Sequence, residues 1–554
     1  MNRYLSTAER KLIAQLYNHL DKQPQRFKSR YKKTALPIQT SLINGFYNIA
    51  AIPHLAPLTL HPEKPVANQA LVTLSVLIKH VSDTDLAWLD EGIRSVLSRC
   101  RYQPWMENWQ NIRASDVAII SCSPPHLSTL LVILCCHNNG YVREAALQQL
   151  LKTDQTLCIR MAYIRANDWV SGVSHTALQI LIGLLPQLEP KVLASTLLLL
   201  DQLRLRRRRN HSELVEKVEL KLQSERGLAS LIDIIKQSDF RLARSAYKLA
   251  ASFTKDIEPL LIIGKKHSDS LIRYWALDLG QQFYKGDALL QFIRIFCNDT
   301  LAPLRKKALY ALIDEFPQQS TSVLKMNLAH ENKGIREIAC FYLKKQIDEI
   351  NISEYYRSTL KTANENELYG LISGLAETGD SSDWKLIKDY EYHHRPKVRK
   401  AVILSTLQLM KEPQDWLHAK LASDTPAEVA AAATTIRTLN NANFDTLEEL
   451  YHRNVNNFRG RAILKIIERG DKWLMLKVIL QSCCNATPDS AEATNESLRR
   501  WHLKHGCPHY YVKPDNSFLD LLLDLSTLVS DEYSQSSEFK ETKDLIVFLR
   551  NLTL

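Results

Sequence analysis

The stretch Val142-Arg143-Glu144-Ala145-Ala146-Leu147 decides the fold, because its pattern recurs along the chain. The pattern is an apolar residue, then a variable or basic residue, then a small residue three positions further on. With Arg143 as reference, equivalent positions fall at 143, 174, 243, 273, 305, 336, 399, 430 and 461. Most neighbouring copies are 30–32 residues apart; the step of 63 contains a weak copy near residues 368–371, and the step of 69 contains an insertion of about seven residues. The sequence is therefore a repeat array with a period close to 31.

Each copy has the spacing of one helix in a helical hairpin. Apolar or small residues fall at −1, +3, +4 and often +7 from the reference, which is one face of an α-helix. Prolines at 303, 396 and 426 stand where a first helical turn tolerates them, and Asp or Asn residues precede the copies as caps. Another apolar segment, such as 125–134, precedes each copy. Because one hairpin cannot bury its own apolar face, we predict an all-α fold, an α-solenoid of stacked hairpins.

The repeated phrase resembles the second helix of HEAT repeats, particularly the short variety also found in phycobilisome lyase-like proteins. In that family an acidic residue is followed by Val-Arg and then alanine. The resemblance covers roughly residues 120–480 and implies the fold of a scaffold. It says almost nothing about function.

The flanking regions are helix-like but out of register with the repeat. Ser6-Thr7-Ala8-Glu9 predicts a capping box, and residues 70–78 predict an apolar helix. We predict an irregular helical N-terminal cap over 1–120, the solenoid over 121–480, and a loop plus C-terminal helical cap over 481–554. Within the last region, the polar, small-residue stretch 482–497 is predicted to be a loop, and 498–501 and 518–525 to be helical.

Length and composition exclude several classes of protein. A chain of 554 residues is too long for a single globular core. No run of about 18 apolar residues predicts a membrane-spanning helix, and the N-terminus lacks the apolar core of a signal peptide. The ten cysteines include the adjacent pairs Cys135–Cys136 and Cys483–Cys484, which suit ordinary disulfides poorly. We predict reduced thiols in a cytoplasmic protein.

The net charge of +11 is concentrated in two acid-free segments, 22–33 and 203–211, which carry six and five basic residues. Concentrated positive charge suits binding of nucleic acid or an acidic protein surface. Solvated loops without a ligand are the alternative. The second segment coincides with the insertion in the repeat, and solenoid insertions often cluster on a binding face. The candidate binding residues are Arg204, Arg206, Arg207, Arg208, Arg209, Arg26, Lys28, Arg30, Lys32 and Lys33, with Lys22 in the same run.

Arginine also recurs at the reference position of the repeat. A row of such side chains on a concave surface could grip phosphate. The second hypothesis is structural pairing with acidic or amide groups near the inter-repeat turn, such as Asp269 or Asp299. The resemblance favours the structural role, because HEAT repeats carry this arginine irrespective of ligand. The six residues are Arg143, Arg273, Arg305, Arg336, Arg399 and Arg461.

Three histidines and a cysteine lie close together in the sequence near the C-terminus, a combination that can bind a metal. Zinc sites usually show paired, regularly spaced ligands, and no second pair is present here. We therefore predict no metal and no cofactor, and a packing segment instead. The residues concerned are His502, His505, Cys507 and His509.

Three enzyme classes share HEAT-like folds and can be weighed in turn. Deoxyhypusine hydroxylases repeat His-Glu pairs, whereas this chain has only His330-Glu331. No residue pattern marks the chromophore pocket of a phycobilin lyase. HEAT-like alkylpurine DNA glycosylases place tryptophans and an aspartate around a cationic groove, with which Trp169 beside Asp168, and Trp275 near Asp278, are superficially compatible. Those enzymes are much shorter, and no phosphate-binding glycine loop or nucleophile elbow is present here.

The sequence thus favours a non-catalytic scaffold that binds partner proteins on its concave face. The alternative is a nucleic-acid-binding solenoid that uses residues 22–33 and 204–209, with a HEAT-like DNA glycosylase as a distant third. Membrane insertion is not expected. The partner and the oligomeric state stay open.

Overall fold

The computed structural model describes residues 3–21, 28–99, 104–120, 124–206, 208–237, 239–347, 350–439, 442–506, 513–532 and 541–553. Every regular element in these ranges is an α-helix or a short 3-10 helix, and they contain no strand. The predicted all-helical repeat fold is confirmed. A search of the described helices finds none with the length and apolar character needed to cross a bilayer.

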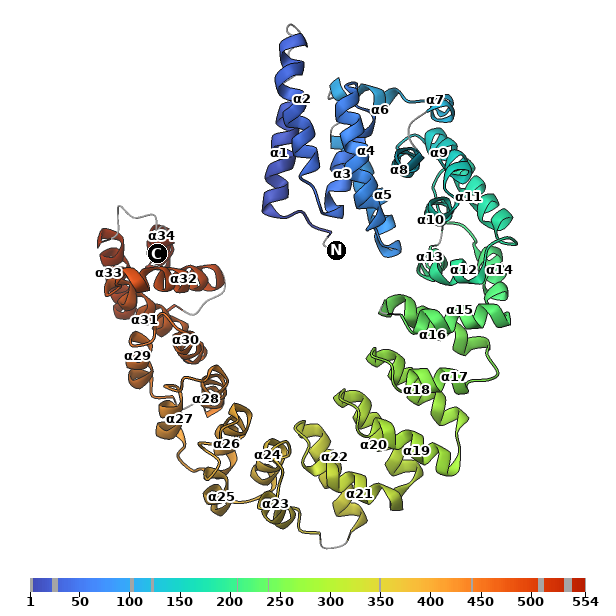
Figure 1. The fold of residues 1–554 in the computed structure, drawn as a ribbon. Coiled ribbons are helices and arrows are strands. Elements are labelled where there is room, and N and C mark those ends of the chain that lie inside the picture. Colours follow the sequence, from blue (N-terminus) through green and yellow to red (C-terminus); the bar gives the residue numbers. More distant parts are fainter. Residues whose placement is uncertain are drawn as a thin grey trace. The chain divides into compact units, whose positions relative to one another are not determined.

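The chain divides into two compact units, Met1–Lys285 and Gly286–Leu554. In the first unit the consecutive pairs α8–α9, α10–α11, α15–α16 and α17–α18 pack as hairpins (Figure 1). Its helices are α1 (Thr7–Asp21), α2 (Lys28–Asn44), α3 (Ile52–Leu55), α4 (Lys64–Lys79), α5 (Leu86–Arg99), α6 (Glu107–Asn111), α7 (Ala114–Ile119), α8 (Pro124–Leu134), α9 (Gly140–Thr153), α10 (Gln155–Arg165), α11 (Ser171–Leu184), α12 (Pro190–Ser195), α13 (Leu197–Arg204), α14 (Ser212–Leu222), α15 (Glu225–Ile235), α16 (Phe240–Phe253), α17 (Glu258–Gly264) and α18 (Ser270–Phe283).

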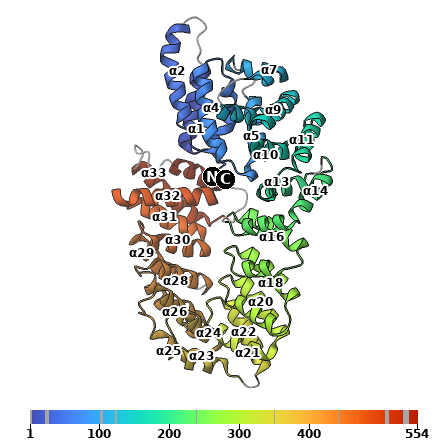
Figure 2. The ribbon, with the colours of Figure 1, turned by 45° about the vertical axis from the view of Figure 1, so that its right-hand side comes forward.

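In the second unit the helices of successive hairpins stack, with α24, α26, α28 and α30 in direct succession (Figures 1 and 2). Even-numbered helices from α20 to α30 lie along one side of this unit. Its helices are α19 (Gly286–Phe296), α20 (Ala302–Glu315), α21 (Pro317–Leu328), α22 (Lys333–Gln346), α23 (Ile352–Leu360), α24 (Leu368–Thr378), α25 (Trp384–Lys388), α26 (Pro396–Leu409), α27 (Gln414–Lys420), α28 (Pro426–Leu439), α29 (Phe444–His452), α30 (Phe458–Gly470), α31 (Lys472–Cys484), α32 (Pro488–His505), α33 (Asn516–Glu532) and α34 (Glu541–Thr553).

The repeat positions form the core as their spacing predicts. The +3 alanines Ala146, Ala276 and Ala308 are fully buried, so neighbouring helices approach closely there. Asp239 and Asp269 accept backbone N–H groups at the starts of α16 and α18, which confirms their capping role. Capping side chains therefore start these helices, and burial of one apolar face packs each helix against its neighbours.

The last two copies of the repeat keep the predicted burial around the reference position but differ from Arg143 and Arg336 at that position itself. Ala430 and Arg461 are exposed, whereas the preceding residues, Val429 and Gly460, are buried. The residue three positions after Val429 is the fully buried Ala432. Ala433 and Leu464, three residues after the reference positions, are also buried, so these two copies keep the predicted apolar face although neither contributes a buried arginine.

Residues 488–497 belong to α32 and are not the predicted loop. Thr487 and Ser490 form a capping box, with Pro488 in the first turn. The small residues Ala491 and Thr494 are buried. Small side chains let this helix pack closely, so the composition that suggests a loop instead serves helix packing.

Candidate functional site

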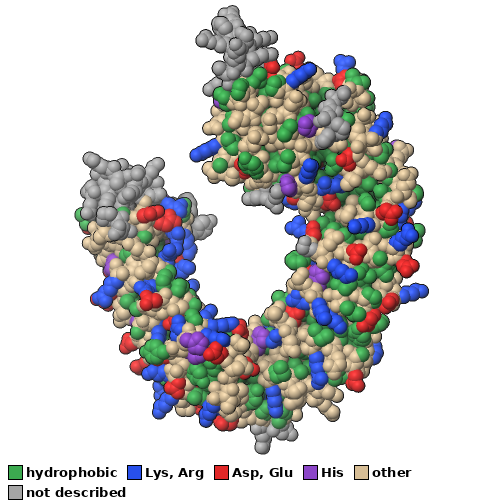
Figure 3. All heavy atoms as spheres, viewed as in Figure 1, with side chains coloured by type: hydrophobic (Ala, Val, Ile, Leu, Met, Phe, Trp, Pro, Cys, Tyr) green, Lys and Arg blue, Asp and Glu red, His purple; other side chains and the backbone are tan. Residues whose placement is uncertain are grey.

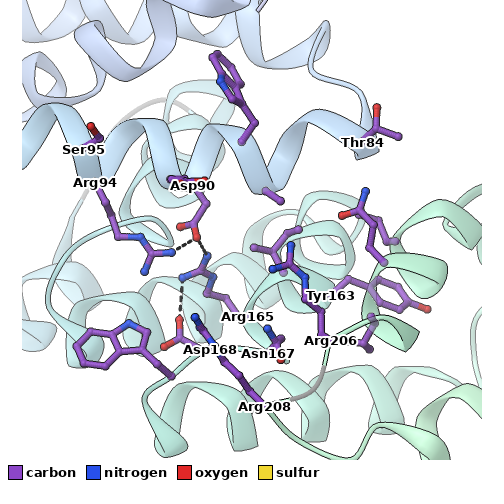
Figure 4. Close-up of a pocket in the computed structure, with 18 of the residues that line it drawn as sticks. Thr84, Asp90, Arg94, Ser95, Tyr163, Arg165, Asn167, Asp168, Arg206 and Arg208 are labelled. Carbon is purple, nitrogen blue, oxygen red and sulfur yellow. Dashed lines mark hydrogen bonds and ion pairs between the residues drawn. The ribbon is translucent and has the colours of Figure 1, made fainter.

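A cleft of about 900 Å³ lies in the first unit, lined by α5, α10, α13 and the segment after α13 (Figure 4). Helix α10 starts at an Asp154 cap and ends at Arg165. In the turn that follows, the Asp168 N–H donates to the Arg165 carbonyl (2.8 Å), and the Val170 N–H donates to Asp168 Oδ1 (3.0 Å). This turn places Arg165, Asn167 and Asp168 at the cleft.

A chain of alternating charges crosses the floor of the cleft. Arg143 and Arg165 pair with Asp168 at 2.7 and 2.8 Å, and Arg165 also pairs with Asp90 at 2.5 Å. Arg94 completes the chain on Asp90 (Figure 4). The side chains of Arg143, Arg165 and Asp168 are no more than 2% exposed. Removing one partner would leave a buried charge unpaired, so this network fixes α5, α9 and α10 relative to one another.

The network also sets the ionisation of its members. Burial alone would raise the pKa of Asp168, but the hydrogen bond from Arg143 and the charge of Arg165 lower it below its usual value. Burial and the neighbouring charge of Arg165 lower the pKa of Arg94 to about 10. The network contains three arginines and two aspartates, one more arginine than aspartate.

Three buried polar atoms at the cleft have no hydrogen-bond partner among the described residues: Asp90 Oδ1, Arg165 Nε and Asn167 Oδ1. Such an atom costs about 1–3 kcal/mol when it stays unsatisfied. Two of the three are acceptors and one is a donor. All three atoms are closed off from solvent.

Two arginines of the predicted insertion segment line the cleft. Arg206 and Arg208 are exposed, and neither forms an ion pair with any residue in the described ranges. Trp88 and Trp169 also line the cleft, and Trp169 is 66% exposed. The Arg143 guanidinium lies 5.7 Å from the centre of the Trp169 ring. The cleft therefore combines uncompensated positive charge with accessible aromatic surface.

The remaining arginines of this segment are placed differently. Arg204 pairs with Asp201 at 3.1 Å and with Glu219, so its charge is compensated. Arg209 is half-buried and does not line the cleft. Arg207 lies outside the described residues.

The other basic segment is only partly described. Lys22 and Arg26 lie outside the described residues. The rest of this segment lies in the first turns of α2. The structure describes the backbone of these residues but not their side chains. A binding role for Lys28, Arg30, Lys32 and Lys33 stays a prediction.

Five of the six repeat arginines bond to the turn before their own helix. Each of the five donates to the backbone carbonyl six residues earlier in the chain. Four of them also donate to the carbonyl five residues earlier. Charge-assisted bonds of this kind are among the stronger protein hydrogen bonds. The distances are 2.8 and 2.9 Å for Arg143, 2.9 and 3.0 Å for Arg273, 2.8 Å for Arg305, 2.7 and 2.9 Å for Arg336, and 2.6 and 3.1 Å for Arg399.

Three of these arginines also reach an acid in a later hairpin. Besides the Arg143–Asp168 pair, Arg336 bonds Glu377 at 2.5 Å and Arg399 bonds Glu428 at 2.6 Å. Asp269 and Asp299 are the partners predicted from the sequence. Asp269 pairs with Arg244, and the backbone carbonyl of Asp299 accepts a hydrogen bond from Arg305. Arg461 is exposed and forms no ion pair with a described residue.

Histidines in the same turns were missed in the sequence. Each lies six residues before a repeat arginine, and its Nδ1 accepts the backbone N–H two residues later. Nε2 of the first two also bonds a carbonyl of an earlier element, Trp109 at 2.9 Å and Ile235 at 2.8 Å. The recurring His-x5-Arg spacing could have revealed them. They are His137, His267, His330 and His393.

Asp168, the aspartate that the glycosylase hypothesis requires, already accepts several hydrogen bonds. Asp168 accepts two hydrogen bonds from Arg143, one from Arg165 and one from the Val170 N–H, and its side chain is 1% exposed. It cannot approach a substrate as a base without breaking this network. Trp275 stacks on Tyr247 with ring centres 6.3 Å apart.

One histidine of the C-terminal cluster also already has a hydrogen-bond partner. His505 bonds Glu468 at 2.8 Å, and Cys507 and His509 lie outside the described residues. Among the described residues, one other group has the composition of a metal site: Glu365, His393 and His394. Arg395 already bonds Glu365 at 2.6 Å, which opposes a cation there.

No protein-family model and no curated protein matches the chain. Solved structures similar to it include importin beta (10% identity, covering 100% of this chain and 81% of that one, TM-score 0.29) and the S. pombe condensin Cnd3–Cnd2 subcomplex (14%, 98% and 80%, TM-score 0.31). Kap95p, in its complex with RanGDP, is similar at 12% identity, 99% and 70% coverage and TM-score 0.27. Similarity at these TM-scores carries no argument about partners or function.

Proposed function

We propose that this protein is a non-catalytic helical-repeat scaffold that binds a protein partner through an acidic segment seated in the cleft of the first unit. The observation that carries the proposal is the presence of Arg206 and Arg208 in the lining of the cleft, exposed and without an ion pair to any described residue. Arginine is well suited to carboxylate recognition, because its guanidinium can bond both oxygens.

The mixture of groups at the cleft favours a peptide over nucleic acid. Asp90 and Asn167 line the cleft with oxygen-bearing side chains, and Glu91 adds a further carboxylate. A peptide backbone carries N–H donors for those oxygens, whereas a phosphodiester chain carries none and is repelled by the acids. Trp88 and Trp169 can pack against apolar side chains of the same peptide. The cytoplasmic location predicted from the sequence belongs to this proposal.

Titration with defined probes tests the proposal. A fluorescein-labelled Asp/Glu-rich peptide should bind the full chain, and the same peptide with serine for each acid should not. Arg206→Ala/Arg208→Ala should weaken binding about tenfold, because two exposed charge-assisted contacts contribute roughly 0.5–1 kcal/mol each. Arg499→Ala/Arg500→Ala, which removes two exposed arginines held by Glu496 in the second unit, is the matched control.

Two outcomes would contradict the proposal. The first is equal affinity for the acidic and serine peptides. The second is binding of a labelled DNA duplex that the Arg206→Ala/Arg208→Ala variant loses, with no binding of the acidic peptide. That result would favour the nucleic-acid alternative.

A further inference from the structure

A second concentration of positive charge lies in the second unit, on residues that the sequence did not single out. A hollow of about 470 Å³ is lined by residues of α28, α30, α31 and α32. Figure 3 shows Lys and Arg side chains gathered over α30 and α32. The lining residues, here called the basic cluster, are Arg437, Lys465, Glu468, Arg469, Lys472, Lys504 and His505.

Charge in the basic cluster is nearly of one sign. Five lysines and arginines face a single carboxylate, Glu468, which pairs with Lys504 and His505. Asp471, next in the chain, is occupied in part by capping α31. The Nε atom of Arg437 is buried and has no hydrogen-bond partner among the described residues. The hollow therefore has an excess of positive charge, which an anionic ligand would balance.

The cations also form a line. Arg461, Lys465 and Arg469 follow at four-residue spacing on α30, and all three are exposed. Successive members lie roughly 6 Å apart along the helix axis. Arg437 on α28 and Lys504 on α32 extend the line across neighbouring helices. A line of this length suits a linear polyanion better than one small phosphate.

Among the residues that the structure describes, the lining contains no tryptophan, tyrosine or phenylalanine, and the nearby Trp473 and Trp501 are buried. Proteins that bind unpaired nucleotides usually stack the bases on exposed aromatic side chains. Contacts to a duplex backbone need only cations spaced along the phosphates. We infer that the basic cluster, extended by Arg461, binds the phosphate backbone of double-stranded nucleic acid without reading its sequence.

Fluorescence anisotropy with a labelled DNA duplex tests this inference. The full chain should bind at low salt, and Lys465→Glu/Arg469→Glu should weaken binding by more than tenfold. The milder Lys465→Gln/Arg469→Gln should lower the slope of log affinity against log salt concentration by about two, since each phosphate contact contributes about 0.9. Lys385→Glu/Lys388→Glu, with the same charge change on exposed residues of α25, should leave binding unchanged. Circular dichroism should show equal helix content in all variants.

Other results would overturn the inference. These are absence of duplex binding by the full chain, equal loss in the α25 control, or binding only to phosphatidylserine vesicles. Duplex binding that survives Lys465→Glu/Arg469→Glu but is lost in Arg206→Ala/Arg208→Ala would place the contact in the first unit and overturn it too. Peptide binding at the first-unit cleft uses other residues, so it can succeed or fail independently.

Discussion

Arg143 and Arg461 occupy matching places in the sequence pattern, yet they have different environments in the fold. Arg143 is fully buried and bonds two backbone carbonyls and both oxygens of Asp168. Arg461 is exposed on α30 beside the basic cluster. The same residue type therefore stabilises one hairpin junction and adds surface charge at another position.

Arg143→Ala is expected to destabilise the first unit by about 3–5 kcal/mol, because Asp168 and the turn carbonyls lose buried bonds. Urea unfolding followed by circular dichroism measures the change. Arg461→Ala is the matched control and should change stability by less than about 0.5 kcal/mol. Equal effects of the two substitutions would mean that the buried network contributes little.

His61 gives the first unit a pH dependence. It is 4% exposed, and burial lowers its pKa from 6.5 to about 4. The folded state thus favours neutral His61, so its contribution is complete above pH 6.5 and is lost as the pH falls towards 4. The expected loss is about 3 kcal/mol. Urea midpoints of the wild type and His61→Gln at pH 7 and 4.5 test this, and the variant should show the smaller difference.

At the scale of elements, glycine replaces the repeat's small residue where two elements come closest. A Cβ on Gly370 of α24 would lie 1.7 Å from the Ala329 carbonyl oxygen, just beyond α21. This explains why the copy near residues 368–371 is weak in the sequence. The junction needs a residue smaller than alanine, so the usual motif is lost although the helix is kept.

Gly370→Ala should destabilise the second unit by about 1–3 kcal/mol or more, because backbone must move to admit the methyl group. Gly183→Ala in α11 is the matched control, since its Cβ would meet nothing within 4 Å. That substitution should stabilise its helix by up to about 1 kcal/mol. Thermal unfolding distinguishes the two, and a stabilising Gly370→Ala would refute the close approach.

At the scale of the whole molecule, the chain contains two compact units that meet in sequence at Gly286. Gly286 has a φ of +54°, the left-handed region that glycine adopts most readily. Repeat proteins are held mainly by contacts between neighbouring repeats, so cooperativity can end where contacts thin out.

We therefore expect two unfolding transitions. Arg143→Ala should lower the midpoint of one, and Gly370→Ala that of the other. Differential scanning calorimetry of the two variants and of the double variant measures this, and the two effects should add. A single transition shifted by both substitutions would show that the units unfold together.

Much of the fold could be predicted from the sequence, because short-range chemistry specifies it. The apolar spacing around Arg143, the Asp269 cap and the Ser6–Glu9 capping box all act within a few residues, and the structure contains each of them. The exposure of Arg461 was missed, since its place in the pattern is the same as that of the buried Arg143. Residues 488–497 were missed because only packing separates a helix of small residues from a loop.

The sequence by itself determined the helical hairpin, its period and the concentration of charge at 203–211, since these depend on residues close together in the chain. Only the tertiary structure decided which charges remain available. It paired Arg204 with Glu219, left Arg206 and Arg208 at the cleft without an ion pair to any described residue, and gathered the basic cluster from four separate helices. Pairing and burial join residues that are far apart in sequence, and a local pattern carries no information about such distances.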